Sequence, residues 1–146
     1  MILYAESSAV ITWVLSEERE SEIENALAEA ELIISSDLTM LECERVLVRG
    51  SAVGELSGGE LNRRQVMLRT AAQHWMLLSC DPPVIERAQR PFPNEPIRML
   101  DALHLAFALE AGQMIPDVRI LSLDRRIRKA ARDLGMEVCP ESDQPA

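Results

Sequence analysis

Short apolar runs that alternate with segments of helical spacing are the feature that most constrains the fold of this chain. The expected strands lie at residues 2–4, 32–34, 119–123 and 137–138, while residues 75–78 are either a strand or a helix end. The expected helices lie at residues 7–15, 20–30, 39–48, 57–73, 82–89, 99–111 and 125–134. Three of these helices are expected to end at a glycine, namely Gly50, Gly112 and Gly135. Because parallel strands need a crossover, usually a helix, the pattern predicts a three-layer α/β fold. Its central sheet is expected to be mostly parallel, with about four to five short strands and helices on both faces.

The length of 146 residues fits a single domain, which we expect to span residues 1–140. Residues 141–146 are expected to form a flexible tail. No apolar run approaches the roughly 18 residues of a membrane-spanning helix, and the start MILYAESSAV lacks the features of a signal peptide. We therefore expect a cytoplasmic protein with no membrane association.

The charge balance excludes some classes of function. The formal net charge is −9, so no strongly basic overall field draws in a phosphate backbone, and any nucleic-acid role has to be local. Three cysteines with no CxxC pair, together with two histidines, favour neither a disulfide framework nor a zinc site.

Four acidic residues follow the expected strands or lie near the start of the next helix: Glu6, Glu42, Asp101 and Asp124. Ligands of such sheets bind beyond the carboxyl ends of the strands, where these side chains can meet. If they converge, their repulsion raises some of their pKa values unless a cation lies among them, and carboxylate oxygens favour Mg²⁺ or Mn²⁺. Structural readings stay open for each acid, since helix first turns favour carboxylates. Glu42 has capping-box spacing from Thr39, and Asp124 is a plausible N-cap.

Four sequence blocks carry a resemblance to a known family. The blocks are LYAESSAVITWVL, SSDLTMLECERVLVRG, LDALHLAFAL and ILSLDRRIRKAARDLGMEV. In this order and spacing they resemble the PIN-domain ribonucleases, and among them the small VapC-like toxins of bacterial toxin–antitoxin pairs. The resemblance covers nearly the whole chain and implies a PIN-like fold.

The resemblance implies a metal-dependent endoribonuclease that cleaves single-stranded or structured RNA with a metal-activated water. Glu6, Asp101 and Asp124 would be the ligands of Mg²⁺ or Mn²⁺, directly or through water. Glu42, the fourth candidate catalytic residue, would bind a second metal ion or orient the attacking water. His104, one helical turn from Asp101, recurs in the family segment and is expected to be a packed helix residue rather than a ligand.

The same resemblance suggests supporting residues and partners. Ser8 and Ser122 would hydrogen-bond ligands or metal-bound waters, although a turn or cap role is the alternative. Arg98, Arg125 and Arg126 are candidates for RNA phosphate contacts. The positive residues after Asp124 also have the pattern of a solvated helix face: Arg125, Arg126, Arg128, Lys129 and Arg132. Members of the family usually form homodimers and bind a small antitoxin.

One departure from the family concerns the first acid, which is Glu6 where aspartate is usual. The extra methylene adds about 1.5 Å, and Mg²⁺ requires near-octahedral oxygens at about 2.0 to 2.1 Å. Glutamate therefore shifts the backbone, brings a water between, or weakens the site. The alternative function is a catalytically weak or silent PIN-like module that dimerises and binds an antitoxin or RNA.

Other acidic Mg²⁺ sites on doubly wound sheets fit less well. Phosphatases of that kind use Asp-x-Asp after the first strand, where this chain has Glu6, Ser7 and Ser8. Phospho-receiver domains use a lysine after a late strand, and the sole lysine, Lys129, lies inside a late helix. Neither GxGxxG nor GxxxxGK occurs, so the nucleotide-binding loops also fail.

Overall fold

The computed structural model describes residues 1–143, so residues 144–146 of the expected tail 141–146 lie outside the described residues. The strands are β1 (Ile2–Ala5), β2 (Leu32–Ser36), β3 (Met76–Leu78), β4 (Val118–Leu121) and β5 (Val138–Cys139). The helices are α1 (Ser7–Leu15), α2 (Glu20–Glu29), α3 (Asp37–Ala52), α4 (Gly58–Ala72), α5 (Pro82–Gln89), α6 (Met99–Met114) and α7 (Arg125–Asp133). No helix within residues 1–143 is long and apolar enough to cross a membrane.

The five strands form one parallel sheet in the order β3-β2-β1-β4-β5. This confirms the predicted α/β sheet, and it shows that the uncertain segment after α4 is a strand. The chain runs outward from β1 through β2 and β3, then crosses back to place β4 on the other side of β1. The β1–β4 boundary is therefore the switch point where such sheets bind ligands. Just beyond it the Glu6 amide donates to the Leu121 carbonyl at 3.0 Å.

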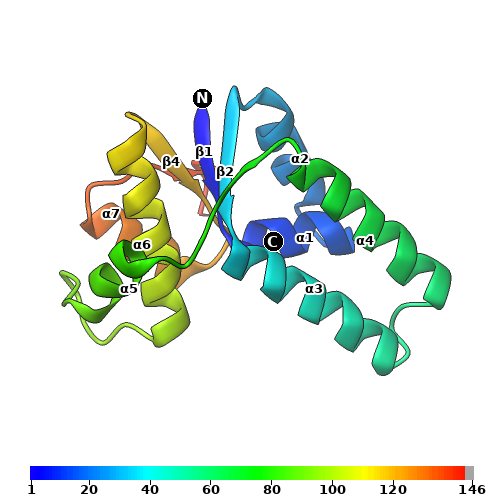
Figure 1. The fold of residues 1–146 in the computed structure, drawn as a ribbon. Helices are drawn as coiled ribbons and strands as arrows, with labels where there is room; N and C mark the ends of the chain where they lie inside the picture. Colours follow the sequence, from blue (N-terminus) through cyan, green and yellow to red (C-terminus); the bar gives the residue numbers. More distant parts are fainter. Residues whose placement is uncertain (144–146) are drawn as a thin grey trace.

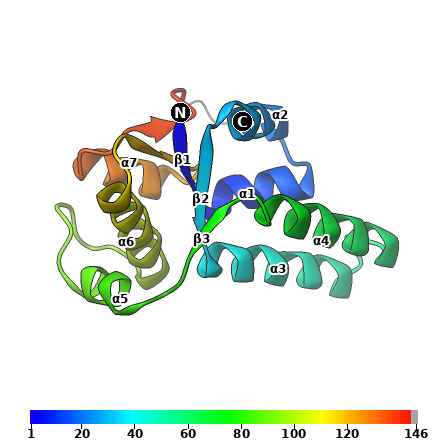
Figure 2. The same cartoon turned by 45° about the horizontal axis from the view of Figure 1, so that its top comes forward.

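Helices cover both faces of the sheet, as predicted. Figure 1 shows α1, α2, α3 and α4 on one side and α5, α6 and α7 on the other, and the turned view in Figure 2 keeps this division. Alternation along β1 explains the two cores, because Leu3 and Ala5 pack with the first helical layer while Tyr4 packs with the second. All three side chains are fully buried. The layers thus fix β1, and with it the position of Glu6, from both sides.

Two predicted helix ends are wrong. The third helix continues through Gly50 to Ala52, and α6 continues through Gly112 to Met114. A glycine within a helix costs only about 1 kcal/mol, which flanking helical residues can offset. At Gly50 a Cβ atom would lie 3.1 Å from Leu56 Cδ1, so the missing side chain lets the following loop pack against α3. Gly135, with φ of +81°, does follow the end of α7 as predicted.

Arg128 is buried and is not part of a solvated helix face, contrary to the prediction for this segment. Its guanidinium donates to the carbonyl oxygens of Ser122 at 2.8 Å and Pro140 at 2.5 Å, and it pairs with Asp143 at 2.7 Å. The sequence pattern missed this because the acceptors are backbone atoms and a carboxylate from the end of the chain. Arg128 thereby ties residues 140–143 to the end of β4.

Candidate functional site

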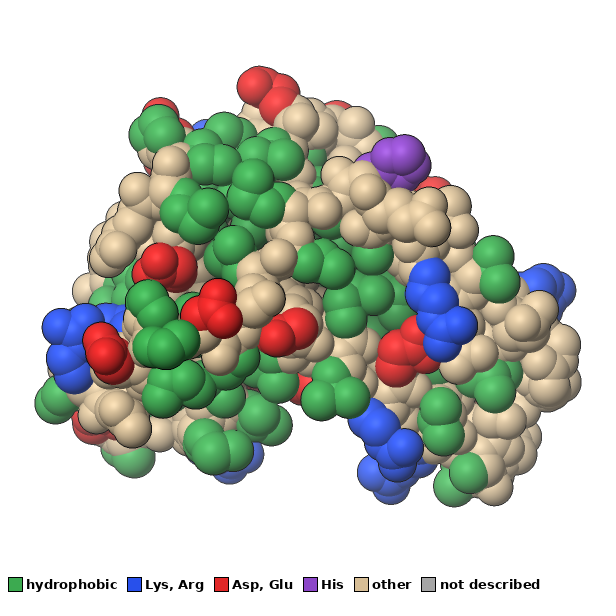
Figure 3. All heavy atoms as spheres, viewed as in Figure 1, with side chains coloured by type: hydrophobic (Ala, Val, Ile, Leu, Met, Phe, Trp, Pro, Cys, Tyr) green, Lys and Arg blue, Asp and Glu red, His purple; other side chains and the backbone are tan. Residues whose placement is uncertain are grey.

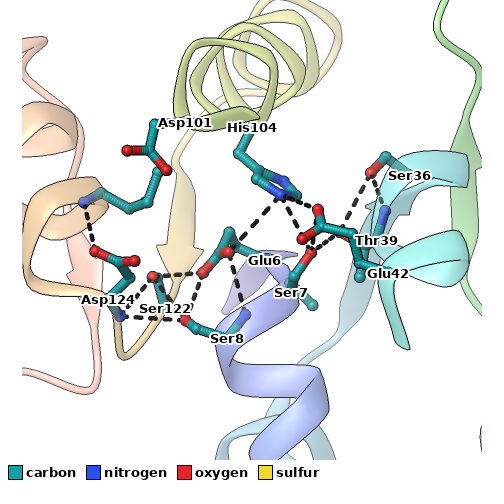
Figure 4. Close-up of polar contacts among 12 residues, drawn as sticks. Glu6, Ser7, Ser8, Ser36, Thr39, Glu42, Asp101, His104, Ser122 and Asp124 are labelled. Carbon is teal, nitrogen blue, oxygen red and sulfur yellow. Dashed lines mark hydrogen bonds and ion pairs between the residues drawn. The ribbon is translucent and has the colours of Figure 1, made fainter. Parts of the chain in front are cut away.

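The four predicted acids meet at the carboxyl ends of the strands. Glu6, Glu42, Asp101 and Asp124 all line one hollow of about 420 Å³. Figure 4 shows how four separate segments place them there, with Glu6 between the Asp124 side and the Glu42 side. Glu6 is the N-cap of α1, and its neighbours come from α3, α6 and the start of α7. The predicted convergence is therefore present in the structure.

Glu6 is held by hydrogen bonds to both of its carboxylate oxygens. Its Oε1 accepts from the Ser8 amide at 3.1 Å, and its Oε2 accepts from the hydroxyls of Ser8 at 2.5 Å and Ser122 at 2.6 Å. The longer side chain thus turns back onto the first turn of α1, which is how this chain accommodates glutamate at the position. Burial raises the pKa of Glu6, and the charge of His104 with the hydrogen bonds from Ser122 and Ser8 offsets this only in part.

Ser8 also joins the two strand ends on either side of the switch point. Its hydroxyl oxygen accepts from the backbone amides of Leu123 at 2.9 Å and Asp124 at 3.2 Å while its proton goes to Glu6. Ser122 lies in the same group, because its Oγ is 3.1 Å from that of Ser8. Ser8 and Ser122 therefore position the first acid against the last one.

Glu42 belongs to a second group, formed with His104 and Ser7. Its Oε1 lies 2.6 Å from His104 Nε2 and accepts from the Ser7 hydroxyl at 3.1 Å. Burial alone would raise the pKa of Glu42, but the hydrogen bond and charge of His104, with the bond from Ser7, lower it. The capping-box reading with Thr39 is wrong, since α3 begins at Asp37 and its N-cap Ser36 accepts from the Thr39 amide. Glu42 is thus in the second turn and free to face the site.

His104 is the residue whose role the sequence least revealed. It is buried as expected, yet its Nε2 is also 3.9 Å from Glu6 Oε1, so the ring lies between two carboxylates. Burial alone would lower the pKa of His104, but the bond to Glu42 and the charges of Glu6 and Glu42 raise it. Nδ1 has no hydrogen-bond partner within residues 1–143. Because an ionised carboxylate can only accept, Nε2 is the donor in the contact with Glu42.

A chain of hydroxyls supports this second group from behind. The Tyr4 hydroxyl donates to Ser36 Oγ at 3.1 Å, and Ser7 Oγ lies 3.4 Å from Thr39 Oγ1. These residues are buried, and the sequence signal for them was the density of Ser and Thr after β1 and β2. Hydrogen-bonded hydroxyls of this kind fix the start of α3, from which Glu42 projects.

Asp101 and Asp124 face a guanidinium across the other side of the hollow. Arg126 Nε is 3.8 Å from Asp101 Oδ2, and its Nη2 is 3.6 Å from Asp124 Oδ2. Asp124 is also the N-cap of α7, as its position predicted, because its Oδ1 accepts from the Arg126 amide at 2.8 Å. The cap uses one oxygen and leaves Oδ2 directed toward the hollow.

The donor types at this site fit a divalent cation. Carboxylate oxygens are the ligands that Mg²⁺ and Mn²⁺ prefer, and all four acids line the one hollow. As the side chains stand, however, no group of three Asp, Glu, His or Cys residues within residues 1–143 is arranged to hold a metal ion. The oxygens of Glu6 accept from Ser8 and Ser122, and those of Asp101 and Asp124 lie near Arg126. A bound ion would compete with these partners for the carboxylate oxygens.

The predicted phosphate-binding arginines divide into two groups. Arg98 and Arg126 line the acidic hollow, and their contact with phosphate stays a prediction. Arg125 is exposed on α7 and is not among the residues that line this hollow. Its contact with RNA stays a prediction.

A larger hollow of about 860 Å³ opens at the opposite end of the sheet, near Met1 and Asp117. Four of its charged lining groups form two pairs, and Asp117 is a fifth. The Met1 amino group contacts Glu31 at 3.0 Å, and Arg119 contacts Glu137 at 2.8 Å. It therefore lacks the converging carboxylates that single out the smaller hollow.

Comparisons with known proteins agree with this geometry. The family model described as PIN domain matches residues 3–133. Ribonuclease VapC46 of Mycobacterium tuberculosis is 33% identical over 140 residues, which cover 96% of this chain and 98% of the relative.

Solved structures share the fold at lower identity. FitAcB from Neisseria gonorrhoeae aligns with a TM-score of 0.70 at 18% identity, over 94% of this chain and 96% of that one. A toxin–antitoxin complex from Klebsiella pneumoniae aligns with a TM-score of 0.62 at 15% identity, over 99% and 100% of the two chains. Together with the family match over residues 3–133, these findings show that the chain is a VapC-like member of the PIN-domain family.

Proposed function

We propose that this protein is a divalent-metal-dependent endoribonuclease and the toxin of a toxin–antitoxin pair. The observation that carries the proposal is the meeting of Glu6, Glu42, Asp101 and Asp124, from four distant segments, around one hollow. The similarity to a protein named a ribonuclease supports the same reaction class.

The residues of the hollow suggest a division of labour. Asp101 and Asp124 would hold Mg²⁺ or Mn²⁺ after Arg126 turns away, with Glu6 as the third ligand, directly or through water. A bound cation of this kind lowers the pKa of a water molecule and offsets negative charge that develops on the phosphate. Ser8 and Ser122 would keep the Glu6 carboxylate in place.

Glu42 is suited to orient the attacking water. Its lowered pKa keeps it ionised near neutral pH, and His104 and Ser7 both engage Oε1. Oε2 has no hydrogen-bond partner in the described part of the chain, so it can accept from a water molecule. The water oxygen would attack phosphorus while its proton moves toward Glu42, and the bond from phosphorus to the leaving ribose oxygen would break.

The direct test is RNA cleavage by the purified full chain in millimolar Mg²⁺ or Mn²⁺. Cleavage should stop with EDTA and in Asp101→Asn, while the circular dichroism spectrum and thermal unfolding of the variant stay close to wild type. Loss of cleavage without loss of fold supports metal-assisted hydrolysis. No cleavage of any RNA by wild type would contradict the proposal.

A catalytically silent binding module is the second candidate. It is favoured by the three hydrogen bonds that fix Glu6 and by the Arg126 pairs on Asp101 and Asp124. A module of this kind would show neither cleavage nor stabilisation by Mg²⁺ or Mn²⁺, which distinguishes it from the enzyme.

An antitoxin partner fits the surface around the hollow. Figure 3 shows hydrophobic and acidic side chains side by side on the face seen in Figure 1, with basic side chains at its edges and on its right half. Met99 and Leu100 line the hollow and are 74% and 43% exposed, and Leu41 on α3 is 59% exposed. A small protein with apolar side chains and an arginine directed at the acids would match both properties. The homodimer expected from the family, and the cytoplasmic location expected from the sequence, belong to the same proposal.

A further inference from the structure

A second hollow adjoins the acidic one. It has a volume of about 500 Å³ and shares Arg98, Asp101 and Arg126 with the acidic hollow, so the two are neighbours. It extends away between the loop before α6 and the outer face of α7, where Ile97 and Lys129 also line it. We call this second hollow the basic groove.

The charge of the basic groove is opposite to that of the chain as a whole. Arg98, Arg126 and Lys129 line it together with the carboxylates Asp101 and Asp133, which leaves an excess of one positive charge in a chain of net charge −9. Arg126 lies 3.8 Å from Asp101 and Lys129 pairs with Asp133 at 3.0 Å, whereas Arg98 pairs with no carboxylate in residues 1–143. Lys129 is also the only lysine of the chain. A local excess of positive charge beside a site for phosphodiester chemistry is the pattern expected for backbone binding.

The cations that line the groove come from two elements. Arg126 and Lys129 are three residues apart on α7, so their side chains leave the same face of the helix about 5–6 Å apart at Cβ. Arg98 lies on the opposite wall, at the N-cap of α6. Cations spread over two walls can contact successive phosphates of a strand, whereas a small anion would need all of the cations to converge on one point.

The far end of the groove is fixed by a bridge between its two walls. Asp133 accepts from Lys129 Nζ at 3.0 Å and from Asn94 Nδ2 at 2.5 Å, which joins α7 to the loop before α6. The pKa of Asp133 is lowered by these bonds, so the bridge is ionised at neutral pH. Between the walls, Pro96, Ile97 and Ala130 supply an apolar floor.

We propose that the basic groove binds the single-stranded RNA on one side of the cleaved bond. Arg98 and Lys129 contact successive phosphates that flank the scissile one, and the apolar floor takes the face of a ribose or base. Arg126, shared by both hollows, moves from Asp101 and Asp124 toward the RNA backbone when the substrate enters. This assignment rests on the proposed nuclease function and adds the path of the substrate to it.

The test measures RNA binding separately from cleavage. The full-length protein is titrated with a fluorescent single-stranded RNA oligonucleotide in EDTA, and the dissociation constant is followed against salt concentration. Arg98→Ala and Lys129→Met should each raise the dissociation constant several-fold. Each should also reduce the salt slope by about 0.7, and the double variant by about 1.4, because each lost phosphate contact releases fewer counterions.

Two controls separate these contacts from a loss of fold or a change in total charge. Arg63→Ala removes the same charge from an exposed position on α4, on the other side of the sheet, and should leave the salt slope at its wild-type value. Lys129→Arg keeps the positive charge and should bind as wild type. Thermal unfolding of each variant confirms that it is folded.

The outcomes distinguish this inference from the nuclease proposal. If wild type cleaves RNA while Arg98→Ala and Lys129→Met bind with wild-type salt slopes, RNA binding in the basic groove is refuted and the nuclease proposal is retained. Equal competition by an oligoglutamate peptide would also overturn it, because the groove would then be a general anion site. If wild type binds no RNA at all, both proposals fail.

Discussion

Replacing His104 tests whether the ring holds Glu42 as a charged partner or only fills space. The two variants are His104→Ala, which removes the donor, and His104→Gln, which keeps an amide donor near the place of Nε2 but no positive charge. His74, the other histidine, is exposed in the turn after α4, and His74→Gln is the matched control.

The magnitude follows from the contact itself. The Nε2–Oε1 distance of 2.6 Å and the burial of His104 indicate a charge-assisted hydrogen bond, which contributes about 1.5–3 kcal/mol. Glu42 is partly exposed, with 28% of its side chain accessible, so water can replace part of the lost interaction. We expect His104→Ala to lower the free energy of unfolding by about 2–3 kcal/mol and His104→Gln by about 1 kcal/mol in mildly acidic buffer.

The pH dependence has a defined sign for each partner. The folded pKa of His104 is raised from 6.5, so its contribution is complete below 6.5 and is lost as pH rises through the folded value. The folded pKa of Glu42 is lowered from 4.5, so its contribution is present above 4.5 and is lost as pH falls through the folded value. The charged pair is therefore complete between these two reference values.

Urea unfolding of wild type and the three variants measures the effect at two pH values. The first is about pH 5.5, where the charged pair is complete, and the second is a higher pH, because a rise in pH above 6.5 removes the charge of His104 as it passes the raised pKa. The deficit of His104→Gln should shrink at the higher pH because wild type loses the same positive charge there. The deficit of His104→Ala should shrink less, since the neutral hydrogen bond and the packing are still missing. A His104→Gln deficit that is equal at both pH values would refute the charged pair, and so would a similar pH trend in His74→Gln.

Three further predictions concern groups around the same hollow. Without metal, Glu6→Gln should be more stable than wild type as pH rises above 4.5, because the raised pKa of Glu6 makes the wild type lose stability through that range. Urea unfolding in EDTA measures this difference. Mn²⁺ should stabilise the wild type and not the variant. Arg126→Ala should raise the Mn²⁺ affinity about fivefold, or about 1 kcal/mol, because it removes a cation from Asp101 and Asp124. Calorimetry measures the affinity, and an unchanged value would contradict the idea that Mn²⁺ replaces Arg126 at these carboxylates. Arg128→Met should lower the free energy of unfolding by about 2–4 kcal/mol, because two buried carbonyl oxygens lose their donor. Arg132→Met, at an exposed position, is the control and should change the free energy of unfolding by less than about 0.5 kcal/mol.

The order of the elements and the meeting of the acids could be predicted because both depend on local pattern. Apolar runs and helical spacing gave the strands and helices, and parallel crossovers then required Glu6 and Asp124 to emerge at the same edge. Helix ends were less predictable, since α3 and α6 continue through glycines that packing around them tolerates.

The polar partners of the site could not be predicted in the same way. His104 and Glu42 are 62 residues apart, and no spacing rule joins a histidine on one helix to a carboxylate on another. The same holds for Arg128, whose charged neighbours in the sequence suggest a wet surface while its acceptors come from strand ends and the last described residues. The sequence pattern thus predicts the order of the strands and helices, whereas tertiary hydrogen bonds determine which polar side chains contact the site.

The contacts of Arg128 with residues 140–143 reinforce a link between two parts of the molecule that the pairing of β4 with β5 already joins. One guanidinium holds both the Ser122 carbonyl, whose side chain steadies Glu6, and the residues from Pro140 to Asp143. Proteolytic trimming that removes Asp143, or a bulky fusion that pulls this segment away, should therefore loosen the first acid although the cut lies far along the sequence. An affinity tag fused after residue 146 should therefore be joined by a long flexible linker. Without one, tagged and untagged preparations can differ in activity because the tag disturbs residues 140–143.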